Sequence, residues 1–177
     1  MSKLRIMAIS ATLALATACA PTMGPPPPPP GVSAPSPTVF RPEDFSWSAV
    51  PGRNTIDGRL TYRQGAVRYT CSGAGVVLTP ETPWTRRRMT ILYSSPEAAA
   101  LPADEVRART PSAPNDDYSS FVRRTTCDAA DRFSFSNLPD GAWFVITVAR
   151  PSAGAGESVA IMRRVVTRGG RISPIDL

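Results

Sequence analysis

The residues that could carry chemistry in this chain are arginines, aspartates and cysteines, because the sequence contains no histidine. Without an imidazole there is no Ser-His-Asp or Cys-His machinery and no histidine metal ligand. The chain has 20 basic and 14 acidic residues, giving a formal net charge of +6. The remaining possibilities are anion binding by arginine, metal or acid–base chemistry by aspartate, and thiol or disulfide chemistry by cysteine.

Three arginine clusters are candidates for binding an anion such as a lipid headgroup or an envelope polymer. Each cluster is expected on a different strand, and the three could converge on one face. The alternative is that edge strands carry these charges to resist association with other sheets. The clusters contain Arg86, Arg87, Arg88, Arg123, Arg124, Arg163 and Arg164.

The aspartates offer two further possibilities. Asp128, Asp131 and Asp140 gather around one expected hairpin and could bind calcium, but that ion prefers about six to eight oxygens and turn chemistry explains the same residues. The neighbours Asp116 and Asp117 could act as an acid and a base, but adjacent strand residues point to opposite faces and a solvated loop is the favoured explanation. We therefore predict no metal ion, no catalytic residue and no cofactor.

The three cysteines divide into one near the N-terminus and one pair. Cys19 follows a basic start, an apolar run and small residues, which together predict a secretory signal peptide over residues 1–18. Cys71 and Cys127 each precede a turn, and an oxidising compartment predicts a structural disulfide between them. A redox-active pair is the alternative, but these two cysteines lack the CxxC spacing.

Residues 1–19 resemble the signal of a bacterial lipoprotein precursor, in which the cysteine after the cleavage site receives lipid. The resemblance implies a lipid anchor at Cys19. Because Ala20 follows that cysteine, it also implies the outer membrane, with the protein facing the periplasm. Residues 16–18 would also serve as an ordinary cleavage site, which leaves simple secretion as the alternative.

A proline-rich stretch separates this signal from the rest of the chain. Residues 25–30 are all proline and should form an extended strut of roughly 19 Å, at about 3.1 Å per residue. A docking site for a proline-binding partner is the alternative. We predict a signal peptide over residues 1–18, a disordered, lipid-anchored linker over residues 19–52 and one folded domain over residues 53–177.

The predicted domain has the pattern of an all-β protein. Polar and aromatic residues alternate over residues 132–136, and an apolar run at 143–149 is typical of a central strand. Residues 158–168 predict another strand, and Met89, Ile91 and Tyr93 alternate in the same way. Glycine-containing turns separate these segments, so we predict a single seven-stranded β-sandwich.

Residues 94–117 do not follow this alternation of short strands and turns, and they form a segment longer than most loops in compact domains. Ser95, followed by Pro96 and Glu97, could begin one or two helical turns that Pro102 would interrupt. We interpret the segment as a tolerated insertion, with a binding loop as the alternative.

Three stretches share a pattern with one known family. Residues 54–60 end in G-x-L, residues 76–80 read V-x-L-x-P, and residues 133–143 read F-x-F-x-N-L-P-x-G-x-W. Together they resemble the bacterial carboxypeptidase regulatory-like domain, a transthyretin-like (prealbumin-like) sandwich. The resemblance implies that these residues build the fold and that the domain has no peptidase activity. Asp131 stands where the family's acidic turn has glycine, and aspartate tolerates the left-handed conformation that glycine adopts there.

The sequence thus predicts an exported, lipid-anchored, non-catalytic β-sandwich that acts as a structural or protein-interaction module of the cell envelope. Its expected partners are the membrane and another envelope protein. The alternative is a binder of a small ligand, an anionic polymer or a lipid headgroup, through the arginine clusters or residues 94–117. Nucleic acid is not expected as a partner outside the cytoplasm.

Overall fold

The computed structural model describes residues 39–177. The signal peptide, Cys19 and the proline run lie outside the described residues. Over residues 39–177 the 3₁₀-helices (η), α-helices and strands follow in the order η1 (Pro42–Phe45), α1 (Ser46–Ala49), β1 (Asn54–Arg59), β2 (Arg63–Gln64), β3 (Val67–Thr70), β4 (Gly75–Pro80), α2 (Pro83–Tyr93), β5 (Ala98–Pro102), α3 (Ala103–Arg109), η2 (Thr110–Ser112), η3 (Ser119–Phe121), β6 (Arg123–Thr126), β7 (Arg132–Leu138), β8 (Gly141–Pro151), β9 (Val159–Thr167) and β10 (Ile172–Asp176).

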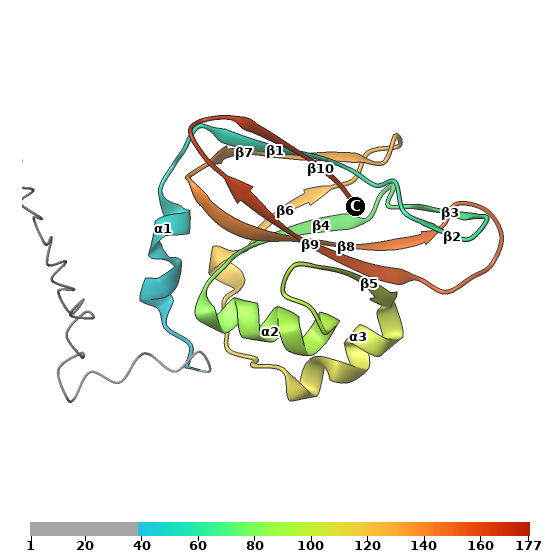
Figure 1. Ribbon diagram of the computed structural model, residues 1–177, viewed down its shortest axis with the longest axis horizontal. Coiled ribbons are helices and arrows are strands. Elements are labelled where there is room, and N and C mark those ends of the chain that lie inside the picture. Colours follow the sequence, from blue (N-terminus) through green and yellow to red (C-terminus); the bar gives the residue numbers. More distant parts are fainter. Residues whose placement is uncertain (1–38) are drawn as a thin grey trace, which may run out of the picture. The chain divides into compact units, whose positions relative to one another are not determined.

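The strands of this described part form two facing sheets, with α2 and α3 on the outer side of the larger one (Figure 1). The small sheet has the order β10-β1-β7, in which β1 runs parallel to β10 and antiparallel to β7. In the large sheet β2-β3-β8-β4-β6 is the main path, and β9 pairs with both β8 and β5. The predicted β-rich class is confirmed as a sandwich-like pair of sheets, whereas the strand count and the helical layer differ from the predicted seven-stranded sandwich.

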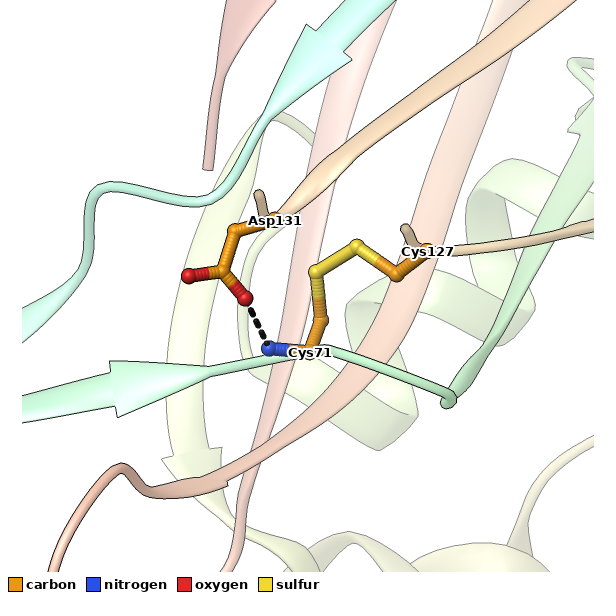
Figure 2. A group of neighbouring side chains, drawn as sticks. All are labelled: Cys71, Cys127 and Asp131. Carbon is orange, nitrogen blue, oxygen red and sulfur yellow. Dashed lines mark hydrogen bonds between the residues drawn. A yellow bond between two sulfur atoms is a disulfide. The ribbon is translucent and has the colours of Figure 1, made fainter. Parts of the chain in front are cut away.

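The predicted disulfide is present: Cys71 and Cys127 are bonded, with their Cα atoms 5.7 Å apart. Figure 2 shows that Asp131 lies beside this bridge, with its carboxylate turned toward Cys71. The bridge joins the segment between β3 and β4 of the large sheet to the segment between β6 and β7, where the chain passes from the large sheet to the small one. Both cysteines are buried, which matches the structural interpretation.

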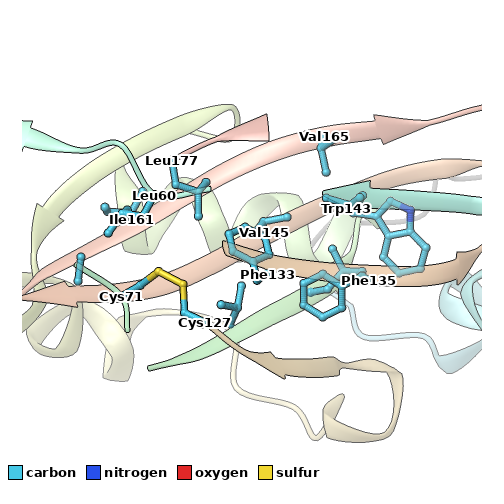
Figure 3. Packing of buried hydrophobic residues seen from close by; sticks show 14 of the residues in the cluster. Leu60, Cys71, Cys127, Phe133, Phe135, Trp143, Val145, Ile161, Val165 and Leu177 are labelled. Atoms are coloured by element: carbon cyan, nitrogen blue, oxygen red, sulfur yellow. A yellow bond between two sulfur atoms is a disulfide. The ribbon is translucent and has the colours of Figure 1, made fainter. Parts of the chain in front are cut away.

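The main core fills the space between the two sheets (Figure 3). Phe133 and Phe135 point inward from β7, as their alternation with polar residues predicts, and Trp143 and Val145 face them from β8. Gly58 on β1 lies under the ring of Phe133, where an added Cβ would stand only 1.9 Å from a ring carbon. The glycine of the opening G-x-L pattern therefore makes room for an aromatic ring.

A second core lies between the large sheet and the helices, and it corrects one prediction. Met89 and Tyr93 were expected on a strand, but they belong to α2 and pack on Phe144 and Met162. The physical reason is a capping box at the helix start. The Thr82 side chain accepts a hydrogen bond from the backbone of Thr85, whose side chain in turn accepts one from the backbone of Thr82. The first arginine cluster is consequently helical too.

Residues 94–117 also differ from expectation. Their first part forms β5, which pairs with β9 from Ala98 opposite Arg163 to Pro102 opposite Val159. Pro102 precedes helix α3 and does not interrupt one, since proline needs no N–H partner at a helix start. The expected insertion therefore contributes one strand to the large sheet and one helix to the layer that covers it.

The packed body begins before residue 53, within the segment predicted to be a linker. Phe45 is fully buried and stacks on Phe121, with ring centroids 4.7 Å apart. Trp47 meets Trp143 edge-on at 4.8 Å. These aromatic contacts hold η1 and α1 against the sheets. Within residues 39–177, none of the helices has the length and apolar character needed to cross a membrane.

Candidate functional site

Arg86 and Arg164, two of the predicted anion-binding arginines, both bind the carboxylate of Glu81. Arg86 of α2 donates to Glu81 at 2.5 Å and to Glu97 at 2.8 Å, while Nε of Arg164 on β9 donates to Glu81 at 2.6 Å. The hydrogen bond to Glu81, followed by that to Glu97, raises the pKa of Arg86 above its usual value. These two guanidiniums are therefore already occupied by anions of the protein itself.

The remaining arginines of the three clusters lie in different surroundings. Arg123 donates to the carbonyl of Ser48 at 3.0 Å and lies over the ring of Trp143, so it fastens α1 to the sheets. Arg87 on α2 and Arg163 on β9 are exposed. In the described structure the seven side chains thus divide among an ion-pair network, a structural contact, two exposed positions and the groove described next.

A groove of about 520 Å³ lies beside α2 and brings Arg88 and Arg124 together. Pockets of this size hold small ligands or one or two units of a polymer. The groove is built by α2, the segment that follows α3, and strands β4 and β6. It is lined by Val77, Arg88, Asn115, Asp116, Asp117, Tyr118, Ser119, Val122 and Arg124.

Arg88 is the most deeply held polar side chain of the groove. It is only 8 % exposed, and its guanidinium lies 5.6 Å from the centre of the Tyr118 ring. Among the described residues, only the carbonyl of Pro114 accepts a hydrogen bond from it, and its buried Nε has no partner there. Unsatisfied buried donors are uncommon, which sets this arginine apart from the other charged side chains of the groove.

Tyr118 is the partly exposed aromatic ring of the groove, and a buried tryptophan holds it in place. The ring meets Trp84 edge-on, with centroids 5.0 Å apart, and Trp84 is completely buried. The indole Nε1 of Trp84 donates to Asp116 at 3.1 Å. The same tryptophan packs on Phe45, so the ring and the carboxylate are both fixed by the aromatic cluster that anchors η1.

The carboxylate of Asp117 is also fixed before any ligand arrives. It accepts hydrogen bonds from the backbone N–H of Ser119 at 3.0 Å and from its hydroxyl at 2.7 Å. The hydroxyl bond, followed by the backbone bond, lowers the pKa of Asp117, so the group is ionised at neutral pH. Beside it stand Asn115 and the exposed guanidinium of Arg124, whose strand pairs with β4 opposite Val77.

The aspartates weighed as calcium ligands serve separate turns. Asp128 accepts from the backbone N–H groups of Ala130 and Arg132, while Asp131 turns toward the disulfide. Asp140 accepts from the Asn54 side chain and from the backbone of Gly169, and the Asn54 bond is the main reason why its pKa is lowered. Turn chemistry therefore accounts for all three carboxylates.

A larger hollow of about 760 Å³ lies on the small sheet. Charged side chains such as Asp57, Arg59, Arg132 and Asp176 line it, and its one aromatic residue, Phe133, is buried in the core. The groove beside α2 combines a partly exposed aromatic ring with fixed donors and acceptors, whereas this hollow combines charged side chains with Ser134, Pro174 and Ile175 and has no exposed aromatic ring. The sequence singled out Arg88, Arg124, Asp116 and Asp117 individually, but gave no sign that they would share a groove.

No family model and no curated protein matches this chain. Among solved structures, the chain is similar to a protein of Pseudomonas aeruginosa whose crystal structure is described as that of a putative carbohydrate binding protein. The TM-score is 0.58 at 21% sequence identity, over 78% of this chain and 96% of the other. At this identity the likeness shows a shared β-rich fold.

Proposed function

We propose that this protein is an exported, non-catalytic binding module of the bacterial cell envelope that holds a carbohydrate in the groove beside α2. The observation that carries the proposal is the groove itself. It presents the partly exposed ring of Tyr118 among side chains that donate and accept hydrogen bonds, here Arg88, Arg124 and Asp117. Sugar rings have one apolar C–H face and a rim of hydroxyls, and this combination matches both.

Two further observations support carbohydrate as the ligand. The groove has the volume of a small-ligand site and its polar groups are held by the protein before binding, which reduces the entropy lost on binding. The solved protein with a similar fold is described as a putative carbohydrate binding protein, and that description concerns the neighbour. The predicted anionic polymer is replaced in this proposal, because Arg86 and Arg164 already bind carboxylates.

The direct test uses the mature chain with Cys19→Ser, so that the protein is soluble without lipid. We expect it to bind members of a panel of bacterial and plant oligosaccharides in calorimetry, and to leave them uncleaved. Tyr118→Ala should weaken binding about tenfold, since aromatic contacts of this kind contribute about 0.5–1.5 kcal/mol beyond their buried area. Tyr62→Ala, which alters a partly exposed tyrosine outside the groove, is the matched control.

We also propose that Cys19 carries the lipid anchor and that the proline run holds the domain away from the outer membrane. Metabolic labelling with a fatty acid should mark the wild-type protein and not Cys19→Ala, and globomycin should block the processing. A wild-type protein that stays unlabelled and leaves membranes in carbonate would show simple secretion instead. The carbohydrate proposal does not depend on this result.

We assign the body to the carboxypeptidase regulatory-like, transthyretin-like class as part of the same proposal. In support, the three motif stretches form β1, β4 and the β7–β8 hairpin. The F-x-F residues and Trp143 all face the core, as a purely structural role requires. An experimental structure with these stretches on other strands would contradict this assignment.

A further inference from the structure

The charges that line the groove beside α2 balance one another. Two guanidiniums, those of Arg88 and Arg124, face a lining that also contains the carboxylates of Asp116 and Asp117. A negatively charged ligand that pairs with the arginines also meets the two aspartates, and a positively charged ligand that pairs with the aspartates also meets the two arginines. Bringing like charges together at a binding site is costly and suppresses binding of the wrong partner.

Sugar hydroxyls can use both kinds of group at once. Each hydroxyl donates one hydrogen bond and accepts others, whereas a guanidinium only donates and an ionised carboxylate only accepts. Adjacent hydroxyls of one ring could therefore donate to Asp117 and accept from Arg124. The guanidinium of Arg88, which also lines the groove, is a second group that only donates.

The protein holds three of these four charged groups in place in advance, whereas the guanidinium of Arg124 is exposed. Asp116 is held by Trp84 and Asp117 by Ser119, and Arg88 is held between Pro114 and the Tyr118 ring. Groups fixed before binding discriminate between ligands more sharply than mobile ones.

From this balance we infer that the groove selects uncharged sugar units and rejects both uronic acids and amino sugars. The inference rests on the proposed function and narrows its substrate class. Tyr118 contacts the C–H face of the ring, Asp116 and Asp117 accept from its hydroxyls, and Arg88 and Arg124 donate to them.

The experiment compares three probe classes by calorimetry, with the mature Cys19→Ser chain. The probes are neutral oligosaccharides of glucose, galactose and mannose, oligogalacturonates, and glucosamine oligomers. We expect one or more neutral probes to bind, and the two charged classes to bind at least tenfold more weakly than the best neutral probe.

Two surface variants separate charge selection from simple loss of contacts. Asp117→Asn removes one negative charge, so it should improve the relative binding of galacturonates and reduce that of glucosamine oligomers. Arg124→Gln should shift both ratios in the opposite direction. Asp176→Asn lies in the hollow on the small sheet, outside the groove, and should leave every ratio unchanged. Circular dichroism confirms that each variant is folded.

The possible results are distinguishable. Galacturonates that bind as tightly as the best neutral probe, or ratios that do not move in either groove variant, would overturn the inference and leave carbohydrate binding in place. A protein that binds none of the probes, with no heat that depends on Tyr118, would overturn the proposed function as well.

Discussion

The carboxylate of Asp131 accepts a hydrogen bond from the backbone N–H of Cys71 at 2.9 Å (Figure 2). The same oxygen accepts the hydroxyl of Thr70 at 2.5 Å, and Asp131 itself is buried. Its φ of 61° lies in the left-handed region, as the comparison with the family's glycine predicted. The aspartate therefore does more than occupy a glycine position, because its side chain ties the turn before β7 to the end of β3.

This arrangement predicts an order of stability among variants of Asp131. Asp131→Ala loses the buried hydrogen bonds and keeps the left-handed backbone, so the free energy of unfolding should fall by about 3 kcal/mol. Asp131→Gly loses the same bonds but adopts this φ freely, and should be about 1 kcal/mol more stable than the alanine variant. Urea unfolding with the disulfide intact measures both, and an alanine variant at least as stable as the glycine variant contradicts the account.

Removing the disulfide should destabilise the domain strongly. Cys71 and Cys127 are separated by 56 positions in the sequence. In the chain-entropy model a loop of this length contributes about 4 kcal/mol by restricting the unfolded chain. We expect the Cys71→Ala/Cys127→Ala double variant to lose roughly this amount in urea unfolding. Adding reductant to the wild type should reproduce the loss and should not affect the double variant.

Glu81 should contribute more than an ordinary surface ion pair. Its side chain is only 12 % exposed and accepts from both Arg86 and Arg164. Glu81→Gln should lower the free energy of unfolding by about 2 kcal/mol, since hydrogen bonds to charged groups are worth about 1.5–3 kcal/mol. Asp104→Asn is the control: its ion pair with Arg107 is exposed at both ends and should matter by less than about 0.5 kcal/mol.

Tyr93 should make the domain sensitive to alkali. Burial is the main cause that raises the pKa of its phenol to about 12, with Tyr118 adding to the shift. The unfolded chain ionises this tyrosine near about pH 10, so its contribution is complete below that pH and is lost as the pH rises toward 12. The loss amounts to about 3 kcal/mol, at about 1.4 kcal/mol per pKa unit. Tyr93→Phe should remove this part of the alkaline destabilisation, and an unchanged pH profile in urea unfolding would refute the assignment.

The strands that the sequence predicts well are those with a strong alternation or a continuous apolar run. Phe133 and Phe135 face the core as expected, and the apolar run of β8 lies in the middle of the large sheet. Helix α2 was mistaken for a strand because Met89, Ile91 and Tyr93 also fit a period of two. The signal that identifies the helix is local, namely threonines at 82 and 85 around a proline.

The groove could not be predicted, because its residues come together only through tertiary packing. Arg88 and Tyr118 are 30 positions apart in the sequence but contact each other directly, and Trp84 packs on Tyr118. Strand β5 could not be predicted either, because its alanines have little intrinsic preference for strands. They form a strand by pairing with β9 at the open edge of the large sheet. The sequence identifies the individual charged residues, but it does not predict which oppositely charged residues lie beside them in the fold.

The parallel pairing of β1 with β10 determines when the small sheet can be completed. Asn54 accepts a hydrogen bond from the backbone of Arg171, 117 positions later, and Thr55 pairs with Ile172. Until β10 has been synthesised, β1, the central strand of the small sheet, lacks one neighbour. Contacts between such distant segments form slowly, because a long loop must first be closed. The pairing of β1 with β10 thus delays completion of the small sheet until nearly all of the described body has been synthesised.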